Sequence, residues 1–269
     1  MPELPEMETY RRLLQQQING LTITDTHVQR EKTINTPPER FAQIVVGNKI
    51  TLVDRRGKHI LFHLENNYVL LLHLMLGGFL YLGTTEDRLE RTAQVTLSFG
   101  SRILYFHGLR LGYLHLLTTA QIDERLSELG PEPLAPTFTL SHFSSLLSGK
   151  RGILKTALVD QHWLAGIGNC YSDEICFHAS ILPTRRIPDL TSEEVAQLFR
   201  SMQAVLKEAI QFGGYMDTPL YRGDGLTGGF DERCRVYDRG GEPCPRCKHA
   251  IVGDKLSSRK VFYCSHCQN

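Results

Sequence analysis

Four cysteines in the last part of the chain have the spacing of a metal site. Cys244, Cys247, Cys264 and Cys267 form the pattern C-x2-C-x16-C-x2-C. Two C-x-x-C turns can place four thiolates at the corners of a tetrahedron, as in structural zinc sites, and the residues between them can form a hairpin. A module this short buries too little apolar surface to fold alone, so metal binding would supply the missing stability. We therefore predict one structural Zn2+ ion with no open coordination position for catalysis.

The alternative for these cysteines is a redox role. A redox motif has a single C-x-x-C close to a βαβ pattern. This sequence has two C-x-x-C pairs and no βαβ pattern near them. The other cysteines, Cys170, Cys176 and Cys234, stand alone. Seven cysteines in 269 residues do not make a disulfide scaffold, so we expect these three to be buried or incidental.

The amino terminus carries a second group of residues that could do chemistry. The chain begins Met-Pro-Glu-Leu-Pro-Glu, and proline at position 2 is small enough that removal of Met1 is expected. Pro2 would then present a secondary amine, and because an α-amino group has a pKa of roughly 8, part of it is neutral near pH 7. Such an amine can form a Schiff base, with Glu3 beside it to move a proton. The alternative is that the prolines only shape the start of a helix.

A helix over residues 4–19 is expected to hold this amino terminus. Pro5 suits an early helical position, apolar residues recur at helical spacing from Met7 onwards, and Gly20 ends the helix. From about residue 20 to residue 118 the pattern is mostly of short β-branched or aromatic segments with turn residues between them. This spacing predicts a β-sandwich or barrel. The predicted strands include 49–53, 59–64, 69–74, 93–99 and 102–107.

The pattern changes after Gly130. The segment L-G-P-E-P-L-A-P at 129–136 cannot form a regular element, so we expect a linker there. Helices dominate beyond it, and the last is the clearest because Thr191 and Glu194 form a capping-box pattern at its start. The glycine-rich residues 213–232 are expected to form a mobile loop. The predicted helices are 141–147, 154–160, 169–179 and 192–212.

Bulk composition describes an ordinary globular chain and identifies no partner. Hydrophobic residues make up 41%, charged residues 22% and the net charge is +1, which excludes disordered and collagen-like chains. The sequence has no run of 18 apolar residues and no basic-then-apolar leader, so we expect a cytoplasmic protein that is not bound to a membrane. Positive charge is local, since residues 233–269 carry eight Lys and Arg against three Asp and Glu. A basic hairpin suits phosphate contact, although it could also be a solvated surface or bind protein.

Five motifs, in order along the chain, resemble those of the formamidopyrimidine-DNA glycosylase and endonuclease VIII family. They are P-E-L-P-E at 2–6, R-R-G-K at 55–58, L-G-P-E-P-L at 129–134, G-I-G-N-C-Y at 166–171 and the four cysteines with Arg259. The resemblance implies an α+β fold with a helix and β-sandwich, then a helix-two-turn-helix domain with a zinc finger. The implied divisions are a catalytic sandwich at 1–130, a linker and first helix at 131–149, a DNA-binding domain with a lid-like loop at 150–232 and a zinc finger at 233–269.

The resemblance also implies an activity, that of a bifunctional DNA glycosylase and abasic-site lyase. In that family role the Pro2 nitrogen attacks the sugar C1′ of a flipped nucleotide, Glu3 assists at the sugar oxygen, and elimination then cuts the strand. Lys58 and Arg259 complete the implied catalytic set by gripping phosphates. Asn169 is implied to do the same, although asparagine is also a preferred helix cap. The remaining implied contacts to DNA are Glu6 in the lesion pocket, His73 at the backbone and Lys155 at a phosphate.

The chain departs from the family where side chains fill the hole left by the flipped base. The family has H-L-x-M-x-G and D-x-R-R/K-F-G, whereas this chain has H-L-M-L-G-G at 73–78 and H-G-L-R-L-G at 107–112. Without gaps, Leu76 stands for the Met, Leu109 for the Arg and Leu111 for the Phe. A shift of one residue would bring Met75 or Arg110 into play instead. Leucine can wedge a base step but cannot hydrogen-bond the orphaned base, so we expect poor discrimination of the opposite base.

Three classes of function remain to be distinguished. The first is the enzyme, acting as a monomer on double-stranded DNA that carries a damaged base or an abasic site, and hence associated with the nucleoid. The second is a non-catalytic or weakly catalytic binder of damaged or bent DNA, which the altered wedge residues would suit. The third is a zinc-ribbon transcription or scaffold protein, which leaves the amino-terminal motif unexplained.

Overall fold

The amino-terminal helix α1 (Leu4–Ile18) begins where the sequence predicts it. Pro5 lies in its first turn, where no intrahelical N–H bond is lost. The Glu6 carboxylate accepts the backbone N–H of Glu3 at 2.8 Å, which satisfies one of the donors that a helix start leaves unpaired. Pro2 and Glu3 are thereby fixed just before the helix, and both are buried.

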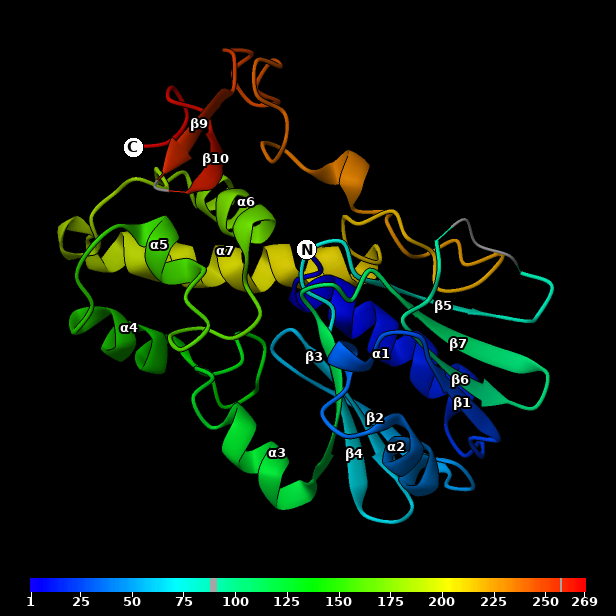
Figure 1. Ribbon diagram of the computed structural model, residues 1–269. Coiled ribbons are helices and arrows are strands. Elements are labelled where there is room, and N and C mark those ends of the chain that lie inside the picture. The colour runs from blue at the N-terminus through cyan, green and yellow to red at the C-terminus, as the bar shows by residue number, and fades with distance from the viewer. Residues whose placement is uncertain (88–90, 257) are drawn as a thin grey trace. The chain divides into compact units, whose positions relative to one another are not determined.

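The computed structural model describes residues 1–87, 91–256 and 258–269. The chain forms two units, one from residues 1–128 with 212–229 and the other from 129–211 with 230–269 (Figure 1). The predicted boundary at residue 130 lies close to the change of unit at 128/129. The segment 212–229 differs from the prediction, which placed it with the helical domain.

The first unit contains two antiparallel four-stranded sheets. Strands predicted at 59–64 and 102–107 have these bounds in the structure, and Asn67 and Gly100 take positive φ in the turns that follow β3 and β6. One sheet has the order β1 (Asp25–Val28), β6 (Val95–Phe99), β7 (Arg102–His107) and β5 (Phe79–Gly83). The other has the order β2 (Ile50–Arg56), β3 (His59–Leu64), β4 (Tyr68–His73) and β8 (Tyr113–Thr118).

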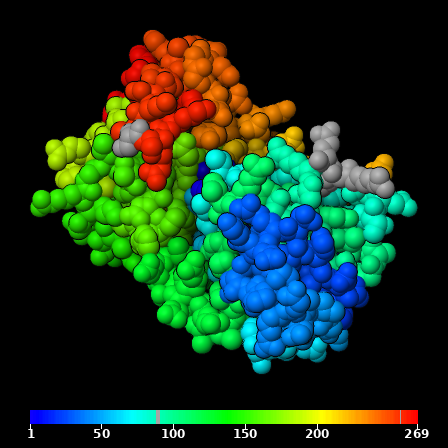
Figure 2. Space-filling model, viewed as in Figure 1, coloured from blue at the N-terminus to red at the C-terminus, as the bar shows by residue number. Residues whose placement is uncertain are grey.

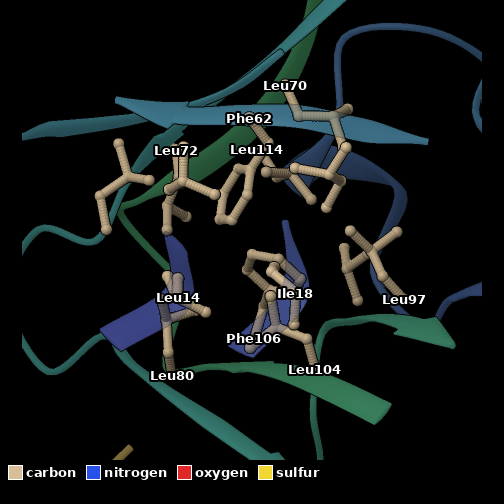
Figure 3. Close-up of a cluster of buried hydrophobic side chains, with 14 of the residues drawn as sticks. Leu14, Ile18, Phe62, Leu70, Leu72, Leu80, Leu97, Leu104, Phe106 and Leu114 are labelled. Atoms are coloured by element: carbon tan, nitrogen blue, oxygen red, sulfur yellow. The ribbon is translucent and has the colours of Figure 1, made fainter. Parts of the chain in front are cut away.

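The core of this unit is filled by side chains from both sheets and from α1. Alternate residues of β5 are buried, as period-2 geometry requires when one face of a sheet packs on another layer. Figure 3 shows the ring of Phe62 facing that of Phe106, with Leu14 and Ile18 of α1 beside them. All four side chains are fully buried. The sandwich expected from the sequence is thus confirmed.

Two short helices of this unit were not predicted. They are α2 (Pro38–Val45) and α3 (Thr119–Leu126), and a 3-10 turn, η1 (Glu31–Thr33), precedes the first. Only two residues of α2 are buried, Phe41 and Val45. A helix of eight residues is too short to be stable alone, so its stability comes from packing.

The segment 212–229 packs on the first unit because its apolar residues belong to that core. Leu220 is fully buried in the sandwich, and its carbonyl accepts the N–H of Leu82 at 2.6 Å. The Tyr10 hydroxyl donates to the Thr218 carbonyl at 2.8 Å. Asp224 then organises the turn, because its carboxylate accepts the N–H of Leu220 at 2.9 Å and both the N–H and the hydroxyl of Thr227.

The second unit is helical. Trp163 is buried against Phe143, as expected for a core residue. The long helix begins with the predicted capping box, in which Thr191 N–H donates to Glu194 at 2.8 Å and Glu194 N–H to the Thr191 hydroxyl at 3.2 Å. The elements are α4 (Leu140–Ser148), α5 (Leu154–Leu158), α6 (Asn169–Ala179), η2 (Ile187–Asp189), α7 (Ser192–Gln211) and η3 (Asp231–Arg233).

The predicted hairpin between the two cysteine pairs is present as β9 (Val252–Leu256) and β10 (Arg259–Tyr263), paired antiparallel. Figure 2 shows this carboxy-terminal module as an orange-to-red surface. Among the residues that the structure describes, no helix has both the length and the apolar character needed to cross a membrane.

The sandwich core makes a direct prediction about stability. Phe62→Ala removes a fully buried ring and should lower the free energy of unfolding by about 3–5 kcal/mol in urea titrations. Leu52→Ala is the control, because Leu52 lies on the neighbouring strand and is 43% exposed, so its loss should change stability little. Equal costs for the two variants would contradict the assigned core.

Candidate active site and DNA-binding residues

The four predicted zinc ligands come together in the second unit. The Sγ atoms of Cys244 and Cys267 lie 3.9 Å apart and those of Cys247 and Cys264 3.5 Å apart, and all four lie within 4.8 Å of one another. Zinc–sulfur bonds of 2.3 Å imply sulfur separations of about 3.8 Å in a tetrahedron. The donor set and its spacing therefore fit one structural Zn2+ ion.

The remaining cysteines are buried, as expected. Cys170 and Cys176 are fully buried in α6, and Cys234 is 5% exposed. Burial raises the pKa of Cys176, since an apolar environment disfavours the thiolate. A thiol held neutral in this way is a packing residue and neither a nucleophile nor a metal ligand.

The amino-terminal centre is held by the two oxygens of one carboxylate. Glu6 is 2% exposed, and its Oε2 accepts Glu3 N–H while its Oε1 accepts Tyr215 N–H, both at 2.8 Å. Gly214 has φ +77°, and a Cβ there would lie 2.2 Å from Glu6 Oε1. Only glycine therefore lets the segment 212–229 approach this carboxylate. The structure thus brings Pro2, Glu3 and Glu6 together with the start of the segment 212–229, which is called the lid below because the lid-like loop was expected in this part of the chain.

Lys58 lies in the turn between β2 and β3, is 6% exposed, and is held in place by charged side chains around the turn. Arg55 donates from Nη1 to the Gly57 carbonyl at 2.9 Å and from Nε to Glu8 at 3.1 Å. Burial would raise the pKa of Glu8, but hydrogen bonds from Arg11 and Arg12 outweigh it and lower the pKa to about 2. Glu8 is therefore charged at neutral pH and anchors the strand–turn that presents Lys58.

His73 lies near Lys58 and is neutral at physiological pH. Burial, followed by the positive charge of Lys58, lowers the pKa of His73 to about 4. Its ring lies against that of His59, with the centroids 4.3 Å apart and the planes tilted by 31°, and His59 in turn hydrogen-bonds the Tyr113 hydroxyl at 3.0 Å. A neutral imidazole can donate one hydrogen bond to a phosphate without adding charge, so Lys58 provides the cation at this place.

The predicted wedge residues separate into exposed and buried ones. Leu76 and Leu111 are 68% and 65% exposed, whereas Leu109 is 1% exposed and belongs to the sandwich core. Leu109 is therefore not available as a wedge, because its apolar side chain turns inward while its N–H is held by Gln94 at 3.0 Å. Leu76, the exposed Arg110 and Leu111 line one surface hollow.

Asn169 does not cap its helix. The N-cap of α6 is Gly168, and Asn169 is the first helical residue. Its side-chain oxygen is buried and has no hydrogen-bond partner within the part of the chain that the structure describes. The capping alternative is therefore wrong, and the amide side chain at this helix N-terminus is not used by the helix itself.

Lys155 is not exposed for the phosphate contact that the resemblance implies. It is 1% exposed, and its ammonium donates to Asp173 Oδ1 at 2.5 Å and to the Asn169 carbonyl at 3.2 Å. Burial raises the pKa of Asp173 to about 7, although Lys155 acts in the opposite direction. Since Lys155 is enclosed in this way, direct contact with a phosphate is excluded, and the residue holds the start of α6 instead.

Arg259 is exposed at the first residue of β10, next to Lys260 and opposite Leu256. Its side chain is thus exposed on the hairpin that lies between the two cysteine pairs. The importance of Asp173 was not predicted. A signal was present, since Asp173 and Glu174 are adjacent acids inside a helix whose other residues are mostly apolar.

Comparisons with known proteins match the whole order of motifs. The models of the formamidopyrimidine-DNA glycosylase N-terminal domain, its H2TH domain and the zinc finger found in FPG and IleRS match residues 1–114, 129–218 and 241–269. Formamidopyrimidine-DNA glycosylases of Pelotomaculum thermopropionicum and Shouchella clausii are 37% and 38% identical, over 100% of this chain and 99% of each relative. A solved complex of Lactococcus lactis Fpg with abasic-site DNA has a TM-score of 0.92 at 30% identity and covers 99% of both chains.

From the zinc site we predict one bound Zn2+ ion per chain, and we expect substitution of one ligand to reduce that amount. The purified protein should hold one Zn2+ per chain by atomic absorption, and Cys264→Ser should lower that ratio because three thiolates bind more weakly than four. Cys176→Ser is the matched control, because Cys176 is equally buried but outside the cluster. Retention of zinc by Cys264→Ser, or its loss from Cys176→Ser, would contradict the assignment.

Proposed function

The chain belongs to the formamidopyrimidine-DNA glycosylase family, and on that premise we propose how its own residues act on DNA. It is a DNA repair enzyme that is both a glycosylase and an abasic-site lyase, and its partner is double-stranded DNA with a damaged base or an abasic site. The observation that carries this conclusion is the match of all three family domains in order along the chain.

In the proposed mechanism Pro2 is the nucleophile. With Met1 removed, its nitrogen bonds to C1′ of the extruded deoxyribose, and the bond from C1′ to the base breaks. Opening of the sugar ring leaves a Schiff base between this nitrogen and C1′. The iminium acidifies C2′, so loss of a C2′ proton expels the 3′ phosphate, and a second elimination expels the 5′ phosphate. Burial of Pro2 and Glu3 before α1 supports this role, because a buried centre limits competition from water.

Glu3 is proposed to move the protons of this sequence. It protonates the ring oxygen as the sugar opens, and it serves as acid and base in the eliminations. Its backbone N–H is tied to the Glu6 carboxylate at 2.8 Å, which fixes its main chain relative to Pro2. Glu6 itself borders the lesion pocket and joins the amino terminus to residue 215 of the lid.

The grip on DNA is proposed to rest on phosphates. Lys58, Asn169 and Arg259 contact the backbone around the flipped nucleotide, and neutral His73 adds a hydrogen bond beside Lys58. Extrusion costs a few kcal/mol of stacking and pairing, which these contacts must offset. Binding should therefore weaken as salt rises.

We also propose that the chain is divided into domains at residues 130, 149 and 232, except that residues 212–229 belong to the catalytic domain.

Lesion search is proposed to be altered. The side chains that can enter the duplex are Leu76 and Leu111, while the position expected to read the orphaned base, Leu109, is buried. Arg110 is exposed in the same hollow and can contact the backbone. These features support excision of oxidised bases with weak dependence on the opposite base.

The alternative function is a non-catalytic or weakly catalytic binder of damaged or bent DNA. The exposed leucines favour it, because apolar wedges alone can kink a duplex. We place either activity at the nucleoid, in the cytoplasm, and propose that the protein acts as a monomer.

Covalent trapping distinguishes the enzyme from the binder. Sodium borohydride added with abasic-site duplex should reduce the Schiff base and leave a stable protein–DNA adduct on a denaturing gel. A duplex with a tetrahydrofuran site has no aldehyde and should give no adduct, which controls for simple binding. Binding to both duplexes without an adduct on either would establish the non-catalytic alternative.

Opposite-base dependence tests the proposed lesion search. Single-turnover excision of an oxidised purine placed opposite C, A, G and T should proceed at similar rates, because Leu109, the residue that the gapless comparison places at the base-reading position, is buried. A preference for C of about tenfold or more, the discrimination that one good bidentate contact supplies, would overturn the proposal.

A further inference from the structure

Helix α6 carries two adjacent acids that are both completely buried, Asp173 and Glu174. Each is bonded to a different part of the segment that forms the zinc finger. Glu174 accepts the backbone N–H groups of residues 235, 236 and 237 at 2.9–3.0 Å. Asp173 Oδ2 accepts the backbone N–H of Phe262 in β10 at 3.1 Å. The hairpin is therefore attached to α6 by carboxylates as well as by apolar packing around Phe177.

The second oxygen of Asp173 is bonded to Lys155. The Nζ–Oδ1 distance is 2.5 Å, both side chains are at most 1% exposed, and Lys155 also donates to the Asn169 carbonyl at 3.2 Å. A continuous chain of buried polar contacts thus runs from the first residue of α6 to β10. Removing one member leaves a buried charge without its counterpart, so the arrangement of the others depends on each.

One end of this chain is Asn169, and the other end, Phe262, lies in the same strand as Arg259. Asn169 and Arg259 are the phosphate-binding residues proposed for this unit. Asn169 is the first residue of α6, and Arg259 is the first residue of β10, three positions before Phe262. We propose that Asp173 is a positioning residue that sets the separation between Asn169 and Arg259, so that both reach phosphates of the same DNA. This inference rests on the proposed function, since it assigns the two residues a shared ligand.

A positioning role for Asp173 can be distinguished from a merely structural role by whether the effect of Arg259 on DNA cleavage depends on Asp173. If Asp173 only supported the fold, its loss would cost stability, and the contribution of Arg259 to DNA cleavage would be unchanged. If it sets the position of Arg259, the contribution of Arg259 should largely disappear once Asp173 is altered, because coupled residues are not additive.

The test is a double-mutant cycle on abasic-site cleavage with the full-length, zinc-loaded protein. Asp173→Asn keeps the size of the side chain and should slow single-turnover cleavage and weaken binding to tetrahydrofuran duplex, each by about tenfold, the size of one lost interaction. Arg259→Ala should slow the parent strongly and the Asp173→Asn protein much less. Glu208→Gln is the control, because Glu208 forms a partly exposed pair with Arg235 in the same unit and should leave cleavage within about twofold.

A second variant keeps the test decisive if Asp173→Asn folds poorly. Lys155→Met with Asp173→Leu removes both charges together, which buried pairs tolerate, and it should fold and bind zinc yet still cleave slowly. Parent-like cleavage by a zinc-loaded Asp173 variant, or an Arg259→Ala cost that is equal in both backgrounds, would overturn the inference. Failure of the parent itself to cleave abasic DNA would instead count against the proposed function.

Discussion

The Glu6 carboxylate is the contact on which the catalytic end of the molecule depends. One oxygen receives the N–H of Glu3 and the other the N–H of Tyr215, so a single buried group fixes both the start of α1 and the base of the lid. The cost of burying a carboxylate is offset by these two hydrogen bonds. The arrangement also requires Gly214, because any side chain there would collide with Glu6. Gly214, which follows α7, is therefore needed for the contact with Glu6 as well as for the end of the helix.

Carboxylates that accept several hydrogen bonds also hold other parts of the molecule together. Glu8 collects three guanidinium groups, Asp224 closes the turn of the lid, and Glu174 receives three backbone N–H groups. Because these acids are bonded to partners within the fold, they do not cancel the excess of Lys and Arg over Asp and Glu in residues 233–269. A net charge of +1 is therefore compatible with binding to nucleic acid. The net charge counts interior and surface groups together, whereas binding depends on the charges at the surface.

Much of the fold could be predicted from local signals. The zinc cluster, the capping box at Thr191 and the strand 59–64 depend on spacing that the sequence displays directly. The errors concern the direction of side chains. A gapless comparison of motifs gives the position of Leu109 but not its burial, and it gives the lysine at 155 but not the aspartate that encloses it. Both outcomes are set by contacts between distant segments, as is the placement of residues 212–229.

The central claim is that the mature chain presents a free secondary amine at Pro2, and the mass of its amino-terminal peptide tests this most directly. Protein recovered from its own cells and shown to cleave abasic DNA should yield a first peptide that begins at Pro2 and carries no added group. An equally active preparation in which Met1 is retained, or in which the Pro2 nitrogen is blocked, would contradict the claim, because an amide nitrogen cannot form the Schiff base.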